Sequence, residues 1–192
     1  MRALSVMTLE QLNALPQQEF AATLAGIFEH SPWVAQRAAL ARPFSSRAQL
    51  LKAMRTAVDA ATLAEQLALI RSHPKLGARS PGHSLLTAAS AREQHRAGLE
   101  ACTPQQREHL DRLNAAYLER FGFPFVLAVR GHDPLSIIDT FERRLGNDRE
   151  IERYTALRQI GAIAGYRLAD MVAAPAEDEF LATIESLSRA SV

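Results

Sequence analysis

Apolar residues recur at helical spacing along most of the chain. Because residues three and four positions apart share one face of a helix, this pattern predicts amphipathic helices that each bury one side. Their boundaries follow from capping residues, prolines and glycines. The predicted helices span residues 8–14, 17–29, 32–41, 47–60, 63–72, 91–100, 104–121, 134–145, 148–173 and 177–189.

Capping residues supply most of the helix starts. A Ser or Thr followed three residues later by Glu or Gln forms a capping box, in which each side chain binds the other residue's backbone N–H. Such pairs are Thr8 with Gln11, Ser46 with Gln49, Thr62 with Glu65, Ser90 with Glu93, and Thr103 with Gln106. Cap-then-proline starts fall at Pro32, Pro104 and Pro134, and Gly122 and Gly146 lie where helices should end.

One segment, residues 123–129 (FPFVLAV), has the composition of a β-strand but lacks a convincing partner strand. No repeat of fixed period and no low-complexity segment interrupts the helical pattern. We therefore expect an all-α fold in which residues 1–192 form a single domain, a bundle of roughly eight to ten helices.

Composition narrows the classes of partner. Hydrophobic residues make up 47% of the chain, in short groups and not in a run that could span a membrane, so we expect a soluble protein. The 22 basic and 21 acidic residues leave a formal charge of +1, with no long stretch of one sign, which argues against nucleic acid or an acidic membrane as partner. A neutral or small polar partner fits better.

Cysteine count and the chain ends bear on location and metal binding. Cys102 is the only cysteine, so neither an intrachain disulfide nor a cysteine metal cluster can form. The N-terminus lacks a secretion signal and the C-terminus lacks a peroxisomal address, so the cytoplasm is the expected location. No H-E-x-x-H motif, Gly-rich phosphate loop or G-x-S-x-G motif is present, so nothing indicates a metal or a nucleotide cofactor.

An arginine lies within the apolar face of the predicted helix 148–173. A step of about 100° per residue places Arg167 between Ile160 and Ile163. A buried guanidinium cannot lose its charge, so it needs a carboxylate, a set of carbonyls or an anionic ligand. Periodicity alone favours a structural salt bridge, or a side chain that extends past its neighbours to water, over a ligand site.

Ser90, Glu93 and Gln94 lie together in the segment SAREQ. As local structure, Ser90 would be the N-cap and Glu93 the third residue of a helix. The box does not explain Gln94, which lies four residues from Ser90 on the adjoining face, so the three side chains could border one cleft. A hydroxyl, a carboxylate and an amide suit a ligand with alternating N–H and C=O groups.

Phe125 and Val126 follow Pro124, which breaks any regular β-ladder. Their backbone groups therefore need partners outside secondary structure. The simplest interpretation is a helix end followed by a buried aromatic segment. A bound heterocycle is the alternative partner.

His73 precedes Pro74 at the end of the predicted helix 63–72. Proline disfavours helical backbone in the residue before it, and a helix C-terminus favours a cationic imidazole. Imidazole is also the side chain best suited to proton transfer near neutral pH, and the following proline stiffens it here. A turn histidine and a catalytic histidine both fit these observations.

These elements occur together in one order, and the set resembles the 2-oxo-4-hydroxy-4-carboxy-5-ureidoimidazoline (OHCU) decarboxylase family. The motifs are HPKLG (73–77), SAREQ (90–94) followed by AGL (97–99), LNAAYLERFGFPFVLAV (113–129), RRLGND (143–148) and IGAIAGYRLADMV (160–172). Each motif is weak alone, but the five in register are specific, and the match runs from about residue 8 to 172. Lys75 stands where many relatives carry an acidic residue, at a position that we take to be variable.

The resemblance implies an all-helical enzyme without cofactor or metal, commonly a homodimer. It implies decarboxylation of a ureidoimidazoline to (S)-allantoin and CO2 in urate breakdown, with a proton delivered to one face. His73 matches the catalytic histidine, as a general acid or base. The residues implied to bind substrate are Ser90, Glu93, Gln94, Phe125, Val126 and Arg167.

The resemblance also suggests a role for each polar side chain. Glu93 would hold His73 or a ring N–H, whereas Gln94 and Ser90 would read the ring and ureido groups. Arg167 would pair with an oxyanion or a carboxylate. Two other functions stay open: a related ureide or hydantoin racemase or hydrolase with the same pocket, and a helical interaction protein in which all these residues are structural.

Overall fold

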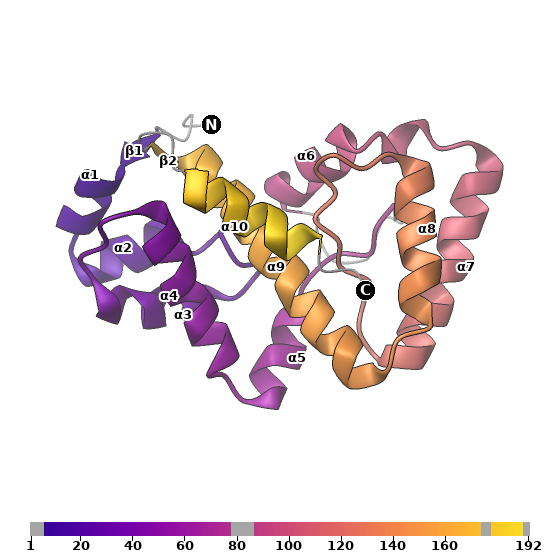
Figure 1. Ribbon diagram of the computed structural model, residues 1–192, viewed down its shortest axis with the longest axis horizontal. Coiled ribbons are helices and arrows are strands. Elements are labelled where there is room, and N and C mark those ends of the chain that lie inside the picture. The colour runs from indigo at the N-terminus through magenta and orange to yellow at the C-terminus, as the bar shows by residue number, and fades with distance from the viewer. Residues whose placement is uncertain (1–5, 78–86, 174–177, 190–192) are drawn as a thin grey trace.

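Helices make up most of the computed structural model, which describes residues 6–77, 87–173 and 178–189 (Figure 1). The α-helices of these residues are α1 (Leu9–Ala14), α2 (Gln17–Thr23), α3 (Pro32–Ala38), α4 (Arg47–Asp59), α5 (Leu63–Arg71), α6 (Ala88–Arg96), α7 (Pro104–Phe121), α8 (Pro134–Leu145), α9 (Arg149–Met171) and α10 (Asp178–Ser188). Two 3-10 turns, η1 (Ala39–Ala41) and η2 (Leu99–Ala101), follow α3 and α6. The all-α prediction is confirmed. None of the described helices combines the length and apolar character needed to cross a membrane.

The predicted caps explain most of the helix starts. Thr8, Thr62 and Thr103 each form the full capping box with the predicted partner. Ser46 caps α4 through the Gln49 N–H, but the Gln49 side chain accepts from the Ser45 N–H instead of closing the box. These short-range bonds fix where the helices begin.

Two predicted helices are wrong in their limits, and both errors affect the site. The predicted helix 17–29 ends at Thr23, and turns occupy the following residues up to His30. The predicted helix 91–100 begins at Ala88, where the Thr87 hydroxyl accepts from the Ser90 N–H at 3.2 Å, so Thr87 and not Ser90 is the N-cap. Gly98, with φ of 71°, ends that helical path in the left-handed conformation that glycine adopts without strain.

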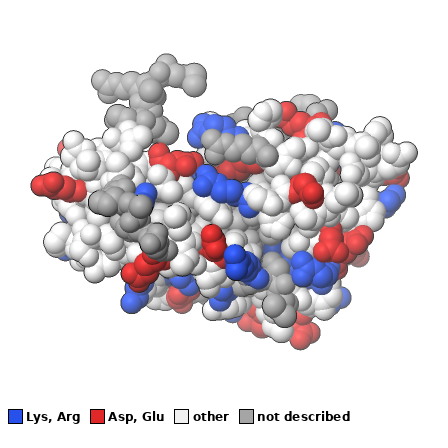
Figure 2. Space-filling view, turned by 45° about the horizontal axis from the view of Figure 1, so that its top comes forward, with Lys and Arg blue, Asp and Glu red and all other residues white. Residues whose placement is uncertain are grey.

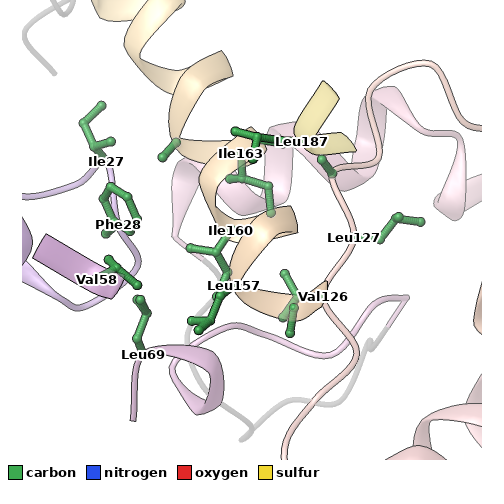
Figure 3. Packing of buried hydrophobic residues seen from close by; sticks show 14 of the residues in the cluster. Ile27, Phe28, Val58, Leu69, Val126, Leu127, Leu157, Ile160, Ile163 and Leu187 are labelled. Atoms are coloured by element: carbon green, nitrogen blue, oxygen red, sulfur yellow. The ribbon is translucent and has the colours of Figure 1, made fainter. Parts of the chain in front are cut away.

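Helix α9 runs through the centre of the fold (Figure 1). Figure 3 shows Ile160 of this helix with Phe28 to one side and Val126 to the other, and all three side chains are buried. Helix α10 packs on α9 at very close range, because a Cβ on Gly165 would lie only 2.5 Å from Ile184 Cγ1. Helix α9 therefore forms a rigid support that packs against the core on the Phe28 side and on the Val126 side.

Two short extended pieces were not predicted. Strand β1 (Met7–Thr8) pairs in parallel with β2 (Val172–Ala173), which ties the start of α1 to the end of α9. A strand of two residues has too short a pattern to detect. The segment 123–129 belongs to no strand of the described chain, in agreement with the missing partner. It passes beside α9 and leads into α8 (Figure 1).

Candidate active site

One cleft brings together all seven residues singled out from the sequence. About 350 Å³ of space, part of it open to solvent, lies between its lining atoms. The lining comes from the loop after α5, from α6, from the segment 123–129 and from α9. The lining residues are His73, Pro74, Leu76, Ser90, Glu93, Gln94, Phe125, Val126, Leu127, Val129, Ile163 and Arg167.

The cleft lining is part polar and part apolar. Its charged and hydrogen-bonding side chains, here called the polar wall, come from the loop after α5, from α6 and from α9, whereas Val129 and Ile163 are apolar. Elsewhere, on the face shown in Figure 2, basic and acidic groups lie interspersed over the surface. Within the described ranges, no group of three or more His, Cys, Asp and Glu side chains is arranged to hold a metal ion.

Arg167 is the centre of the polar wall. Its Nε and Nη2 donate to the two oxygens of Glu93 at 2.8 and 3.0 Å, and Nη1 donates to Glu29 Oε2 at 2.7 Å. Nη2 also donates to Ser90 Oγ at 3.1 Å. Burial works against the charged form, but the hydrogen bonds to Glu93 raise the pKa of Arg167 above its usual value. The predicted burial of this arginine is confirmed, and the predicted salt bridge forms part of the cleft itself.

Glu29 is a member of the site that the sequence did not reveal. The sequence placed it as the last residue of the predicted helix 17–29, but it lies in the turns after α2, almost completely buried. Burial alone would raise the pKa of its carboxyl, but the Arg167 guanidinium and the Thr87 hydroxyl lower it. The need of Arg167 for a carboxylate was the one available signal. Periodicity could not select a partner 138 residues away.

Ser90 acts in the cleft and not as a cap. Its hydroxyl donates to Glu29 Oε1 at 3.1 Å and accepts from Arg167, and the residue is buried. Because Thr87 takes over the capping role one turn earlier, the Ser90 side chain can point toward α9. The original interpretation of SAREQ as a capping box was therefore wrong.

His73 is neutral and oriented. Its Nδ1 lies 3.0 Å from the Leu69 carbonyl, which can only accept, so Nδ1 carries the proton and Nε2 keeps its lone pair. Burial lowers the pKa of the imidazole to about 4 from its usual 6.5, although the Leu69 carbonyl and the Glu29 carboxylate act in the opposite direction. A neutral imidazole at pH 7 can accept a proton through Nε2.

Glu93 does not bind His73, one of the two roles suggested for it. Both of its oxygens accept from Arg167. Its side chain is nevertheless 28% exposed, whereas that of Glu29 is 1% exposed. Glu93 therefore has lone pairs within reach of the cleft, and contact with a ring N–H stays a prediction.

Gln94 fastens the loop that follows His73. Its Oε1 accepts from the Gly77 N–H at 3.0 Å, and Nε2 lies 3.5 Å from the Lys75 carbonyl. Asn114 of α7 holds the same loop by donating to the Leu76 carbonyl at 3.0 Å. The segment HPKLG is thus held by hydrogen bonds from two helices, α6 and α7. A direct contact of Gln94 with the substrate stays a prediction.

Phe125 and Val126 are buried residues of the cleft lining, and Arg144, which has no predicted role, supports them. Arg144 Nη1 donates to the Val126 carbonyl at 2.8 Å, and the guanidinium carbon lies 4.4 Å from the centre of the Phe125 ring. Two residues on, the Ala128 N–H donates to Gln159 Oε1 at 2.9 Å. The backbone of this segment thus finds side-chain partners in place of a β-ladder, as the proline suggested.

Comparison with known proteins agrees with this arrangement. The family model described as OHCU decarboxylase matches residues 13–169. A 2-oxo-4-hydroxy-4-carboxy-5-ureidoimidazoline decarboxylase of Haloferax volcanii is 44% identical over 164 residues, which are 85% of this chain and 95% of that protein. The uric acid degradation bifunctional protein PucL of Bacillus subtilis is 40% identical over 93% of this chain, and the chain spans 35% of its length.

A solved structure shares the fold. The crystal structure of an (S)-allantoin synthase superposes with a TM-score of 0.71 at 28% identity, covering 87% of this chain and 54% of the other. The family model covers all the residues that line the cleft, from His73 to Arg167, and also Glu29, which binds Arg167. This chain belongs to the OHCU decarboxylase family.

Proposed function

We propose that this chain decarboxylates 2-oxo-4-hydroxy-4-carboxy-5-ureidoimidazoline, releasing CO2 and forming (S)-allantoin as a step of urate degradation. Its family membership supports this activity, as do relatives named for the decarboxylase, for uric acid degradation and for (S)-allantoin synthesis. The observation that carries the proposal is a neutral, buried His73 in the same cleft as the Arg167 ion-pair cluster. A proton acceptor and a polar recognition wall are what this reaction needs.

The chemistry requires no external electron acceptor. When the bond to the carboxylate carbon breaks, CO2 leaves and the electron pair stays on the ring, whose conjugated system spreads it. A proton then adds to the ring carbon from one face. A protein accelerates these steps by orienting the carboxylate out of the ring plane and by stabilising the delocalised anion.

His73 is the group that moves a proton. Nε2 accepts the proton of the substrate hydroxyl, or it handles the proton that completes the product, while Nδ1–H stays on the Leu69 carbonyl. That backbone bond fixes the ring plane, so a proton leaves or arrives from one direction. A fixed direction accounts for a single enantiomer of allantoin.

The other six residues bind the substrate. Glu93 accepts from an N–H of the ring, and Ser90 and Gln94 contact the ring and ureido groups. Arg167 pairs with the substrate carboxylate or with an oxyanion. Phe125 and Val126 lie against the ring and present backbone groups to it.

Family membership also suggests the oligomeric state and the location of the enzyme. We infer that residues 1–192 act as one catalytic domain, as a homodimer in the cytoplasm, without cofactor, nucleic acid or membrane. Sedimentation of the purified protein tests the dimer. A monomer with full activity would contradict it.

One assay tests the activity against its alternatives. OHCU is generated in place from urate, the protein is added, and circular dichroism follows the appearance of (S)-allantoin. We expect a chiral signal that rises faster than in the uncatalysed reaction, which gives racemate. Turnover of allantoin itself would instead indicate the related racemase or hydrolase, and no effect from folded protein would indicate an interaction protein.

A further inference from the structure

The peptide group between Val126 and Leu127 has two ends in different surroundings. Its carbonyl, on Val126, accepts from Arg144 Nη1 at 2.8 Å. Its N–H, on Leu127, takes part in no hydrogen bond to a residue that the structure describes. In a trans peptide the N–H points away from the carbonyl. The Leu127 N–H therefore points away from Arg144, and both residues of the peptide, Val126 and Leu127, line the cleft, whereas Arg144 does not.

A buried cluster of side chains holds the Arg144 guanidinium, which binds this peptide, in place. Glu152 accepts from Arg144 Nε at 2.9 Å and Nη2 at 2.5 Å, from Asn147 Nδ2 at 2.7 Å and from the Tyr117 hydroxyl. Burial raises the pKa of Tyr117 far above its usual value, so the hydroxyl keeps the proton that it donates. Arg144 thus has little freedom to leave the Val126 carbonyl.

Aromatic packing fixes the same segment from a second direction. The Phe125 ring is stacked on Phe141 of α8 with 3.8 Å between the ring centres, and the Arg144 guanidinium lies over Phe125. The backbone on the cleft side is therefore held by α8 through one hydrogen bond and two ring contacts. Such a backbone donor needs no reorganisation when charge develops in front of it.

We propose that Arg144 is a positioning residue for the reaction, which aims the Leu127 N–H at a substrate oxygen and strengthens it as a donor through the shared peptide group. A charge-assisted hydrogen bond to the carbonyl pulls electron density from the peptide nitrogen, so hydrogen bonds at the two ends reinforce each other. The matching ligand group is a ring carbonyl that becomes more negative as CO2 leaves. This inference rests on the proposed function.

The test removes the charge while it keeps the core filled. Replacing a buried ion pair by apolar side chains of similar volume is often tolerated, so the variant is Arg144→Met with Glu152→Met and Tyr117→Phe. We expect kcat to fall about tenfold with a smaller change in KM, because the bond strengthens mainly in the transition state. The pH profile of kcat/KM, which reports His73, should keep its shape.

Arg47 offers a matched control. It is also buried, donates Nη1 to a backbone carbonyl, that of Val172, at 3.3 Å, and lies over the Phe180 ring, but it does not line the cleft. Arg47→Met should lower stability and leave the kcat of the folded protein unchanged. Equal kcat losses in both variants, at equal folded fractions by circular dichroism, would overturn the proposal.

Nuclear magnetic resonance of the wild-type protein gives a measurement that does not depend on variant folding. Saturating (S)-allantoin should move the Leu127 amide proton downfield, as a new hydrogen bond does, and the Arg144 Nε–H signal should shift with it while that of Arg47 does not. An unmoved Leu127 amide overturns the proposal. A wild-type protein without activity on OHCU would instead defeat the proposed function itself, so the two failures are distinguishable.

Discussion

Two buried arginines, Arg144 and Arg167, differ in whether their carboxylate partners can still accept a hydrogen bond from a ligand. Arg144 faces one carboxylate, Glu152, whose oxygens also accept from Tyr117 and Asn147. Arg167 faces two carboxylates, of which only Glu29 is fully enclosed. The first cluster is closed within the protein, whereas the second has an open side on the cleft.

This difference separates support from recognition. A closed cluster of buried charges stabilises one backbone arrangement and has no capacity for a ligand. In the open cluster, Glu29 compensates the charge of Arg167 permanently, so Glu93 can turn toward a substrate N–H without leaving a buried cation alone. The open cluster lines the cleft, whereas the closed cluster lies behind the cleft lining and binds it through the Val126 carbonyl.

The largest expected effect comes from the proton-transfer group beside the open cluster. His73→Asn keeps a polar side chain of similar size but removes the base, and the loss of such a group lowers rates by about 10²–10⁴. The circular dichroism assay should show near-complete loss of (S)-allantoin formation, with an unchanged far-ultraviolet spectrum. A folded variant with full activity would remove His73 from the mechanism.

Neutralising one carboxylate in each cluster tests the comparison directly. Glu152→Gln leaves Arg144 buried without its counter-ion, so the free energy of unfolding should fall by about 3–5 kcal/mol. Glu93→Gln should lower it by about 1 kcal/mol or less, because this carboxylate is partly exposed and Arg167 keeps Glu29. Urea unfolding measures both values.

The effects of the same two variants on KM should have the opposite order, with the larger change in Glu93→Gln. Glu93→Gln weakens substrate binding in the open cluster, so its KM should rise about tenfold even though its stability hardly changes. Similar stability losses for the two variants would mean that the Arg167 cluster is as closed as the Arg144 cluster. The distinction between support and recognition would then fail.

Residues that interrupt a local sequence pattern could be recognised from the sequence. Residues whose role depends on contacts with distant parts of the chain could not. Arg167 stood out because it interrupts an apolar face, which is a local signal. Glu29 did not, because turns after α2 bring it to α9 from 138 residues away. Arg144 lies in the last turn of α8, where a basic residue already satisfies the helix dipole.

The fold was more predictable than the site for the same reason. Thr62 with Glu65 determines a helix start within four residues, and Gly122 with φ of 75° determines an end. At Thr87 and Ser90, two residues one turn apart could both act as caps, and only the contact of Ser90 with Glu29 and Arg167 decides between them. Local rules cannot include that tertiary contact.

The pH dependence of the free energy of unfolding should report the neutral His73, which lies beside the open cluster. Its folded pKa is about 4 and its unfolded pKa about 6.5, so below pH 6.5 the unfolded chain binds a proton that the folded chain does not. The free energy of unfolding should therefore fall as the pH drops from 6.5 toward 4, by up to about 1.4 kcal/mol per pH unit.

His73→Asn supplies the reference for this measurement. The variant lacks the titrating imidazole, so its stability should change less over that pH range, and the difference from wild type isolates His73 from other groups such as His132, whose pKa is also lowered by burial. In the wild type, kcat/KM should stay level down to about pH 5. An acid limb near pH 6.5 would show that His73 is not buried as described.

The smallest effect should come from a third arginine, which extends the comparison to the surface. Arg112 of α7 binds Glu108 at 2.8 Å, and both side chains are mostly exposed. Water solvates either group after the other is removed, so Arg112→Ala should change the free energy of unfolding by about 0.5 kcal/mol or less, and kcat not at all. A loss as large as that of Glu152→Gln would contradict the view that enclosure, and not pairing itself, determines what each arginine contributes. Urea unfolding of Arg112→Ala and Glu152→Gln compares the two losses directly. The loss should be small for Arg112→Ala because water solvates an exposed cation whether or not it is paired.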